Sequence, residues 1–207
     1  MHTERWALTR SHKEVGWRCY KTSAIDREAL SKLLLALARR LGTVVSGRGN
    51  KSVEPIVPRD THSAEVRSLS AVYGLGELPM HIDMAHHVRP ARYLLIGCVC
   101  PGQSVAQTRL LETGELAFTS SELSLLSSAP IFVRSGKRSF YSTILDQSRP
   151  FWRYDPGCME PIDSRGEKAL AVMNRVVSRA HPTTHTWSAG EVLLEAGLLL
   201  SDLRLAK

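Results

Sequence analysis

Residues 73–102 read YGLGELPMHIDMAHHVRPARYLLIGCVCPG and contain the most informative pattern in the chain. The pair His81 and Asp83 stands shortly before residues 91–100, ARYLLIGCVC, whose apolar run predicts a buried strand. In an extended segment alternate residues point to the same side, so the imidazole and the carboxylate would lie on the same side of the backbone. We therefore take His81 and Asp83 as candidate metal ligands.

Two ligands do not complete a metal site. Imidazole nitrogen and carboxylate oxygen together suit Fe(II), and the usual non-haem iron arrangement has two histidines and one carboxylate on one face of the metal. A lone His-x-Asp triplet is more often a hydrogen-bonded surface pair. His86 and His87 follow closely. We interpret them as loop residues that face solvent or close the mouth of a pocket.

Composition narrows the class of protein. The chain has 207 residues, 43% hydrophobic and 23% charged, which fits a single globular domain over residues 1–207. The net charge of +7 favours anionic partners, but the basic residues are scattered and no basic run exceeds Arg39-Arg40. Nucleic acid is therefore an unlikely partner. No stretch is long and apolar enough to span a membrane.

The cysteines indicate a reducing compartment. Four in a chain of this length do not make a disulfide framework, and Cys98-x-Cys100 has no second pair at zinc-finger spacing. We interpret Cys98 and Cys100 as small buried residues on one face of a strand. The N-terminal residues contain no apolar signal core, so we expect a cytoplasmic protein.

The remaining pattern predicts an α+β fold without βαβ alternation. The predicted helices cover residues 24–41 (with Asp26 as N-cap), 119–129 (with Thr119 or Ser120 as cap) and 164–181. The predicted strands cover residues 43–47, 91–100, 108–112 and the segment that ends at residue 194. A hairpin is expected around Gly136-Lys137, and a long loop over residues 46–70.

The segment of residues 73–102 resembles the TauD/TfdA-like group of Fe(II)/2-oxoglutarate dioxygenases, the clavaminate-synthase-like family. That group has an H-x-D motif after a loop containing Gly and Pro, then a buried strand, then a Thr that contacts 2-oxoglutarate. Thr108 stands 27 residues after His81, where that Thr is expected. Residues 151–161, FWRYDPGCMEP, and residues 184–194, THTWSAGEVLL, also resemble family segments.

The resemblance implies a double-stranded β-helix (jelly roll) with flanking helices. It also implies Fe(II) held by His81 and Asp83, and 2-oxoglutarate as cosubstrate beside Thr108. The implied reaction is oxidation, usually hydroxylation, of a small anionic or polar molecule, coupled to decarboxylation of 2-oxoglutarate. Arg153 and Tyr154 are candidate substrate-side residues. For Arg153 a structural ion pair is an equal alternative.

The C-terminal residues depart from the family pattern. The family continues with a distal metal His and an Arg for the far carboxylate of 2-oxoglutarate, whereas this chain reads EAGLLLSDLRLAK and has no His after His185. Arg204 has no His before it at the family's spacing, and we assign it no role. The expectation is a divergent or truncated end. The third ligand is left among His86, His87, His181, His185 or none.

Two structural consequences and one rival function follow. If the last jelly-roll strands are absent, an edge is exposed. Residues 193–200, LLEAGLLL, would then cover it locally or pair with a second chain in a homodimer. The rival to the oxygenase is a catalytically degenerate jelly-roll protein that serves as a binding or assembly module, since fold does not imply function. A weaker idea, oxidation of nucleic acid, rests on charge alone.

Overall fold

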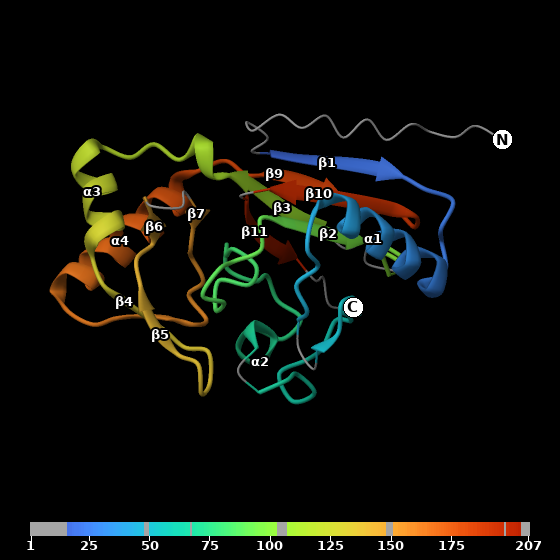
Figure 1. Ribbon diagram of the computed structural model, residues 1–207, viewed down its shortest axis with the longest axis horizontal. Helices are drawn as coiled ribbons and strands as arrows, with labels where there is room; N and C mark the ends of the chain where they lie inside the picture. Colours follow the sequence, from blue (N-terminus) through green and yellow to red (C-terminus); the bar gives the residue numbers. More distant parts are fainter. Residues whose placement is uncertain are drawn as a thin grey trace.

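A computed structural model describes residues 16–47, 50–66, 68–102, 107–147, 151–196 and 198–203 (Figure 1). Its helices are α1 (Arg27–Leu41), α2 (Leu69–Tyr73), the 3₁₀ turn η2 (Thr113–Glu115), α3 (Ser120–Ser128) and α4 (Ser164–Arg179). Its longer strands are β1 (Gly16–Lys21), β2 (Tyr93–Gly97), β3 (Gln107–Glu112), β9 (Thr183–Thr186), β10 (Glu191–Ala196) and β11 (Leu198–Leu203). Its shorter strands are β4 (Ile131–Val133), β5 (Phe140–Ser142), β6 (Leu145–Asp146), β7 (Phe151–Trp152) and β8 (Met159–Pro161).

Two three-stranded antiparallel sheets pack face to face and form the part of the fold that carries the site. Their strand orders are β1-β10-β2 and β11-β3-β9. The buried side chains between them are Leu110, Trp187 and Leu193, with Trp17, Cys19, Leu94, Ile96 and Cys98 packed against them. The predicted combination of helices with antiparallel sheets is confirmed.

Helix α1 covers the outer face of the first sheet (Figure 1). Its N-terminus is capped by Asp26, whose Oδ1 accepts a hydrogen bond from the Ala29 N–H at 2.8 Å, as predicted. Leu30 and Leu37 are buried against this sheet. The contact is close because β2 presents Gly97 there, and an added Cβ would lie 2.9 Å from Leu30 Cδ2.

A second core lies on the side of the molecule away from α1, around α3, α4 and β4 (Figure 1). Leu126 of α3, Ile131 of β4 and Met173 of α4 are all fully buried there. Thr119 and Glu122 form the capping box expected for α3. Helix α4 begins after Asp163, whose side chain caps it, and it ends shortly before Pro182.

Two local predictions are wrong. Residues 43–47 form no strand, because they follow α1 as a connecting segment with no neighbouring strand to pair with. Cys100 is exposed rather than buried, because β2 already ends at Gly97 and the alternation of faces stops there. The hairpin around Gly136-Lys137 is confirmed by the pairing of β4 with β5.

The C-terminal residues pair within the chain. Strand β10 inserts between β1 and β2, and β11 pairs with β3 from Leu198↔Glu112 to Leu203↔Gln107. Residues 193–196 and 198–200, which were expected to cover an exposed edge or pair with a second chain, thus belong to strands of the two sheets. Among these residues no helix has the length and apolar character needed to cross a bilayer.

Candidate functional site

His81 is held in one orientation by backbone contacts. It lies in the segment after α2 and is 7% exposed. The neighbouring Ile82 N–H donates to the Tyr154 carbonyl at 2.7 Å, which fixes the segment to the chain just after β7. The Nδ1–H of His81 donates to the Pro79 carbonyl at 2.9 Å. Such a bond leaves Nε2 as the atom that can bind a cation.

Asp83 lies directly beside that nitrogen. The distance from His81 Nε2 to Asp83 Oδ1 is 3.4 Å, so the predicted pair is brought together. Burial alone would lower the pKa of His81. The hydrogen bond and the charge of Asp83, with the Pro79 carbonyl, outweigh burial and raise this pKa to about 9. The arrangement therefore favours a cation at this point, whether a proton or a metal ion.

The pair opens onto a large groove of about 2100 Å³ that Thr108 also lines. This volume exceeds the roughly 300–1,000 Å³ of a typical small-molecule site, so it has room for more than one ligand. Thr108 is 2% exposed, and its Oγ1 accepts a hydrogen bond from the Trp187 indole N–H at 2.8 Å. The bond orients the hydroxyl, because its proton must point away from the indole.

Arg153 and Tyr154 do not occupy the place expected of substrate-side residues. Neither lines the groove. Arg153 is fully buried, and its guanidinium donates to the carbonyls of Ala85, His87 and Val88 while its plane lies against Phe140 and Phe151. Burial lowers its pKa to about 10.

Arg153 therefore positions the loop that follows Asp83. Arg153 thus has a structural role, as in the alternative given for it above, but its partners are backbone carbonyls and not an acidic side chain. The Tyr154 hydroxyl donates to Asn174 Oδ1 of α4, and burial raises the pKa of Tyr154 to about 12. A buried, paired phenol is part of the packing rather than of the groove wall.

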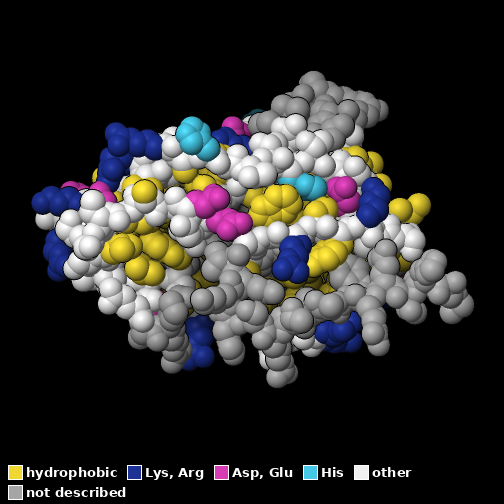
Figure 2. Space-filling model, turned by 90° about the horizontal axis from the view of Figure 1, so that it is seen from above, with side chains coloured by type: hydrophobic (Ala, Val, Ile, Leu, Met, Phe, Trp, Pro, Cys, Tyr) yellow, Lys and Arg dark blue, Asp and Glu magenta, His cyan; other side chains and the backbone are white. Residues whose placement is uncertain are grey.

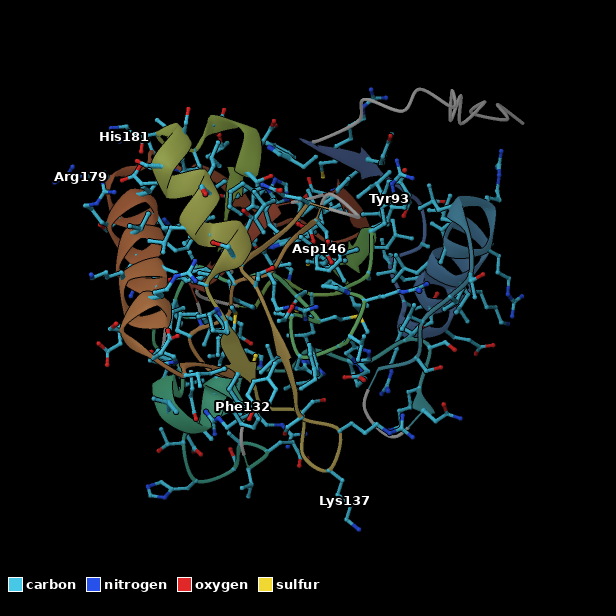
Figure 3. All side chains as sticks on the ribbon, turned by 60° about the vertical axis from the view of Figure 1, so that its left-hand side comes forward. Tyr93, Phe132, Lys137, Asp146, Arg179 and His181 are labelled. Atoms are coloured by element: carbon cyan, nitrogen blue, oxygen red, sulfur yellow. The ribbon has the colours of Figure 1, made fainter. Side chains whose placement is uncertain are left out.

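A third ligand for the pair is not found among the described residues. No other His, Cys, Asp or Glu side chain there completes a three-ligand group with His81 and Asp83. His86 and His87 line the groove, with their rings edge to face at 4.6 Å. His181 lies past the end of α4, well apart from the groove residue Tyr93 (Figure 3).

His185 faces other partners. Its Nε2 lies 3.3 Å from Glu191 Oε2 and 3.8 Å from Cys19 Sγ, and it is not among the groove residues. It is therefore committed to a different cluster. Arg204 lies outside the described residues.

Two groove residues were missed by sequence reasoning. Asp155 lines the groove, and its charge contributes to the raised pKa of His81. Trp187 orients Thr108 from the neighbouring strand end. Asp155 adjoins the quoted Arg153-Tyr154 pair, so a search of that segment for carboxylates could have found it. Trp187 carried no signal, because its partner is distant in sequence.

No protein-family model matches the chain, and no curated protein matches it either. Solved structures do. The non-haem iron oxygenase OrfP in complex with Fe and alpha-ketoglutaric acid matches with a TM-score of 0.68 at 16% identity, over 94% of this chain and 71% of OrfP. Its complex with Fe, succinate and (3S)-hydroxy-L-Arg matches with a TM-score of 0.69 at 15% identity, over 93% and 72%.

Asparagine oxygenase (AsnO) matches with a TM-score of 0.55 at 18% identity, over 65% of this chain and 45% of AsnO. The chain shares its fold with non-haem iron oxygenases. At these identities the likeness concerns the fold alone. The chain spans about half the length of the asparagine oxygenase it matches.

Proposed function

We propose that the chain is an Fe(II)/2-oxoglutarate-dependent oxygenase of the TauD/TfdA-like kind, with its two main sheets forming a double-stranded β-helix. The observation that carries this is the convergence of His81 Nε2 and Asp83 Oδ1, 3.4 Å apart, at a groove that Thr108 also lines. With bonds of about 2.1 Å, adjacent nitrogen and oxygen ligands of an octahedral metal lie about 3.0 Å apart, so the two atoms need to approach by only a few tenths of an ångström. The fold shared with OrfP and AsnO adds support.

The residues present fit a metal held by one imidazole and one carboxylate. In this proposal His81 and Asp83 hold Fe(II), and the Thr108 hydroxyl contacts 2-oxoglutarate. When bound, the iron and cosubstrate would supply the oxidising chemistry, in which O₂ is the oxidant, 2-oxoglutarate is converted to succinate and CO₂, and the substrate is hydroxylated. The protein's part is to fix the ligands. Pro79 sets the tautomer of His81, Arg153 holds the following loop, and Trp187 orients Thr108.

The substrate class we propose is a small polar molecule, such as an amino acid. The matched OrfP and AsnO structures contain hydroxylated arginine and hydroxylated asparagine, respectively. The groove is lined by charged side chains, such as Arg134 and Asp155, and by aromatic ones, such as Tyr93 and Phe132. A large nucleic-acid substrate has less support. Lys and Arg side chains are spaced among acidic and hydrophobic ones on the described part of the face in Figure 2.

The second candidate function is a binding or assembly module on the same scaffold. It is favoured by one observation, that the described residues supply two ligands and no third. A site with two protein ligands binds metal more weakly than one with three. The two functions therefore differ in whether Fe(II) is held at all.

An anaerobic titration separates them. Purified apoprotein receives Fe(II) and then 2-oxoglutarate, and the visible charge-transfer band of iron-chelated 2-oxoglutarate is followed. The oxygenase predicts a band that is lost in His81→Ala and Asp83→Ala and kept in His62→Ala, a change in an exposed turn. A folded wild-type protein with no band would refute the oxygenase and leave the binding module.

A further inference from the structure

A second cluster of metal-binding side chains lies between the two main sheets. Cys19 comes from β1, His185 from β9 and Glu191 from the first position of β10. The three ligand atoms all lie within 4.8 Å of one another. None of the three residues lines the groove that holds His81 and Asp83, so the cluster is a separate feature.

The spacing matches the ligand shell of a tetrahedral zinc ion. Zinc binds thiolate sulfur at about 2.3 Å and imidazole nitrogen or carboxylate oxygen at about 2.0–2.2 Å. At tetrahedral angles these lengths place sulfur about 3.6 Å from nitrogen, and nitrogen about 3.4 Å from oxygen. The Cys19 Sγ to His185 Nε2 distance is 3.8 Å, and the His185 Nε2 to Glu191 Oε2 distance is 3.3 Å. These two distances match within a few tenths of an ångström, and the third pair, Cys19 Sγ and the Glu191 carboxylate, lies within 4.8 Å.

We propose that Cys19, His185 and Glu191 form a zinc site whose fourth position is open to water. Thiolate, imidazole and carboxylate together suit Zn²⁺, and three protein ligands with one open position are a recognised zinc arrangement. The proposal does not depend on iron binding at His81 and Asp83.

The geometry argues against a cysteine nucleophile. In a Cys-His-carboxylate relay the thiol and the carboxylate contact opposite nitrogens of the imidazole ring. Here both contact the same atom, Nε2 of His185. Three groups that converge on one point are arranged for a shared cation.

The surroundings supply the support that a metal site needs. The Ser188 N–H donates to Glu191 Oε2 at 2.8 Å and fixes the carboxylate. The ring of His185 packs against Trp187 at 4.7 Å and Trp17 at 6.0 Å, and its side chain is 12% exposed. This partly dry environment strengthens metal–ligand attraction.

A zinc ion here would cross-link the sandwich. Cys19 and Glu191 belong to the sheet β1-β10-β2, and His185 belongs to β11-β3-β9. His185 is also the register partner of Thr108. Metal binding would therefore fasten both sheets at the strand position of Thr108.

Cobalt substitution tests the site, because a cobalt–thiolate bond gives a near-ultraviolet charge-transfer band that an imidazole–carboxylate site lacks. The apoprotein is titrated with Co(II) and back-titrated with Zn²⁺. We expect the intensity of the band to saturate at one equivalent of Co(II). Added Zn²⁺ should abolish the band, and the variants Cys19→Ser and His185→Gln should lack it. The band should persist in Cys100→Ala, a matched change at an exposed thiol, and in His81→Ala. Zinc at a hundredfold excess over its dissociation constant should raise Tm by about 5–10 °C.

Protection of the wild-type protein gives a test that needs no variant. With Zn²⁺ present, alkylation of Cys19 should slow at least tenfold, and alkylation of Cys100 should be unchanged, as read by peptide mass mapping. The proposal is overturned by a folded wild-type protein without a cobalt band, by a band that survives Cys19→Ser, or by equal alkylation of Cys19 with and without zinc. A band that is lost in His81→Ala would also overturn it by moving the metal to the groove.

Discussion

Arg153→Met is the substitution expected to cost the most stability near the groove. Arg153 is fully buried, and its guanidinium donates to the Ala85, His87 and Val88 carbonyls. Methionine keeps most of the volume between the two phenylalanine rings but donates nothing. Ala85 is fully buried, so its carbonyl loses this donor without gaining water in its place, which costs about 1–3 kcal/mol. The other two carbonyls lie nearer solvent and recover part of their loss through water.

With smaller losses at the two part-buried carbonyls, the sum is about 3–5 kcal/mol in the free energy of unfolding. For a chain of this size that lowers Tm by roughly 6–20 °C. Urea unfolding followed by circular dichroism measures the change. In addition, Fe(II) affinity should fall about 10–100-fold, because the loop after Asp83 is loosened.

The matched control is Arg134→Met. Arg134 pairs with Glu160 at 2.6 Å, but their side chains are 47% and 51% exposed. Exposed pairs contribute about 0–1 kcal/mol, so this variant should unfold close to the wild type. If Arg153→Met were as mild as Arg134→Met, the assignment of Arg153 as the residue that holds the loop would be wrong.

Three further predictions test other contacts. Trp187→Phe removes the N–H donated to Thr108 and should weaken 2-oxoglutarate binding roughly threefold to tenfold in the anaerobic titration, and an unchanged affinity would contradict the orienting role. At pH 8, iodoacetamide should label the exposed Cys100 and spare Cys158 until the chain unfolds. The reason is that burial raises the pKa of Cys158 and leaves little thiolate. Rapid labelling of both cysteines in peptide maps would count against this. Gly97→Ala should cost about 1–3 kcal/mol of unfolding free energy by crowding Leu30, while Gly114→Ala, where a Cβ meets nothing within 4 Å, should cost much less in the same urea assay.

Helix positions could be predicted from the sequence because their signals are local. Asp26, Thr119 and Glu122 cap helices through bonds to residues three positions away. The contact of His81 with Asp83 was predictable for the same reason, since two residues separated by one are constrained by the backbone itself. The prediction of a strand at residues 43–47 was wrong because a strand needs a neighbouring strand to pair with, and that partner cannot be read from the local pattern.

The rest of the site depends on contacts that no local pattern encodes. Arg153 was a candidate substrate-side residue because residues 151–161 resemble a family segment, with a structural ion pair as an equal alternative. Its burial follows from where the loop of Ala85 happens to lie. The cluster of Cys19, His185 and Glu191 joins residues from both ends of the chain and could not be seen before the strand order was known. His185 was considered only as a third ligand beside His81 and Asp83, because nothing in the sequence places Cys19 and Glu191 next to it.

The insertion of β10 between β1 and β2 has a consequence for how the chain acquires its structure during synthesis. Among the residues that the structure describes, β1 pairs with β10 alone, from Gly16↔Ala196 to Lys21↔Glu191, so this partner emerges only with residues 191–196. At the usual ribosomal pace of about 5–20 residues per second, that delay is roughly 10–35 s. Helix α1, already formed by local contacts, can pack against β2 once residues 93–97 emerge, but it meets Val192 of β10 only with residues 191–196. Pairings this distant fold slowly once synthesis ends, so the nascent chain presents an unpaired β1 to chaperones.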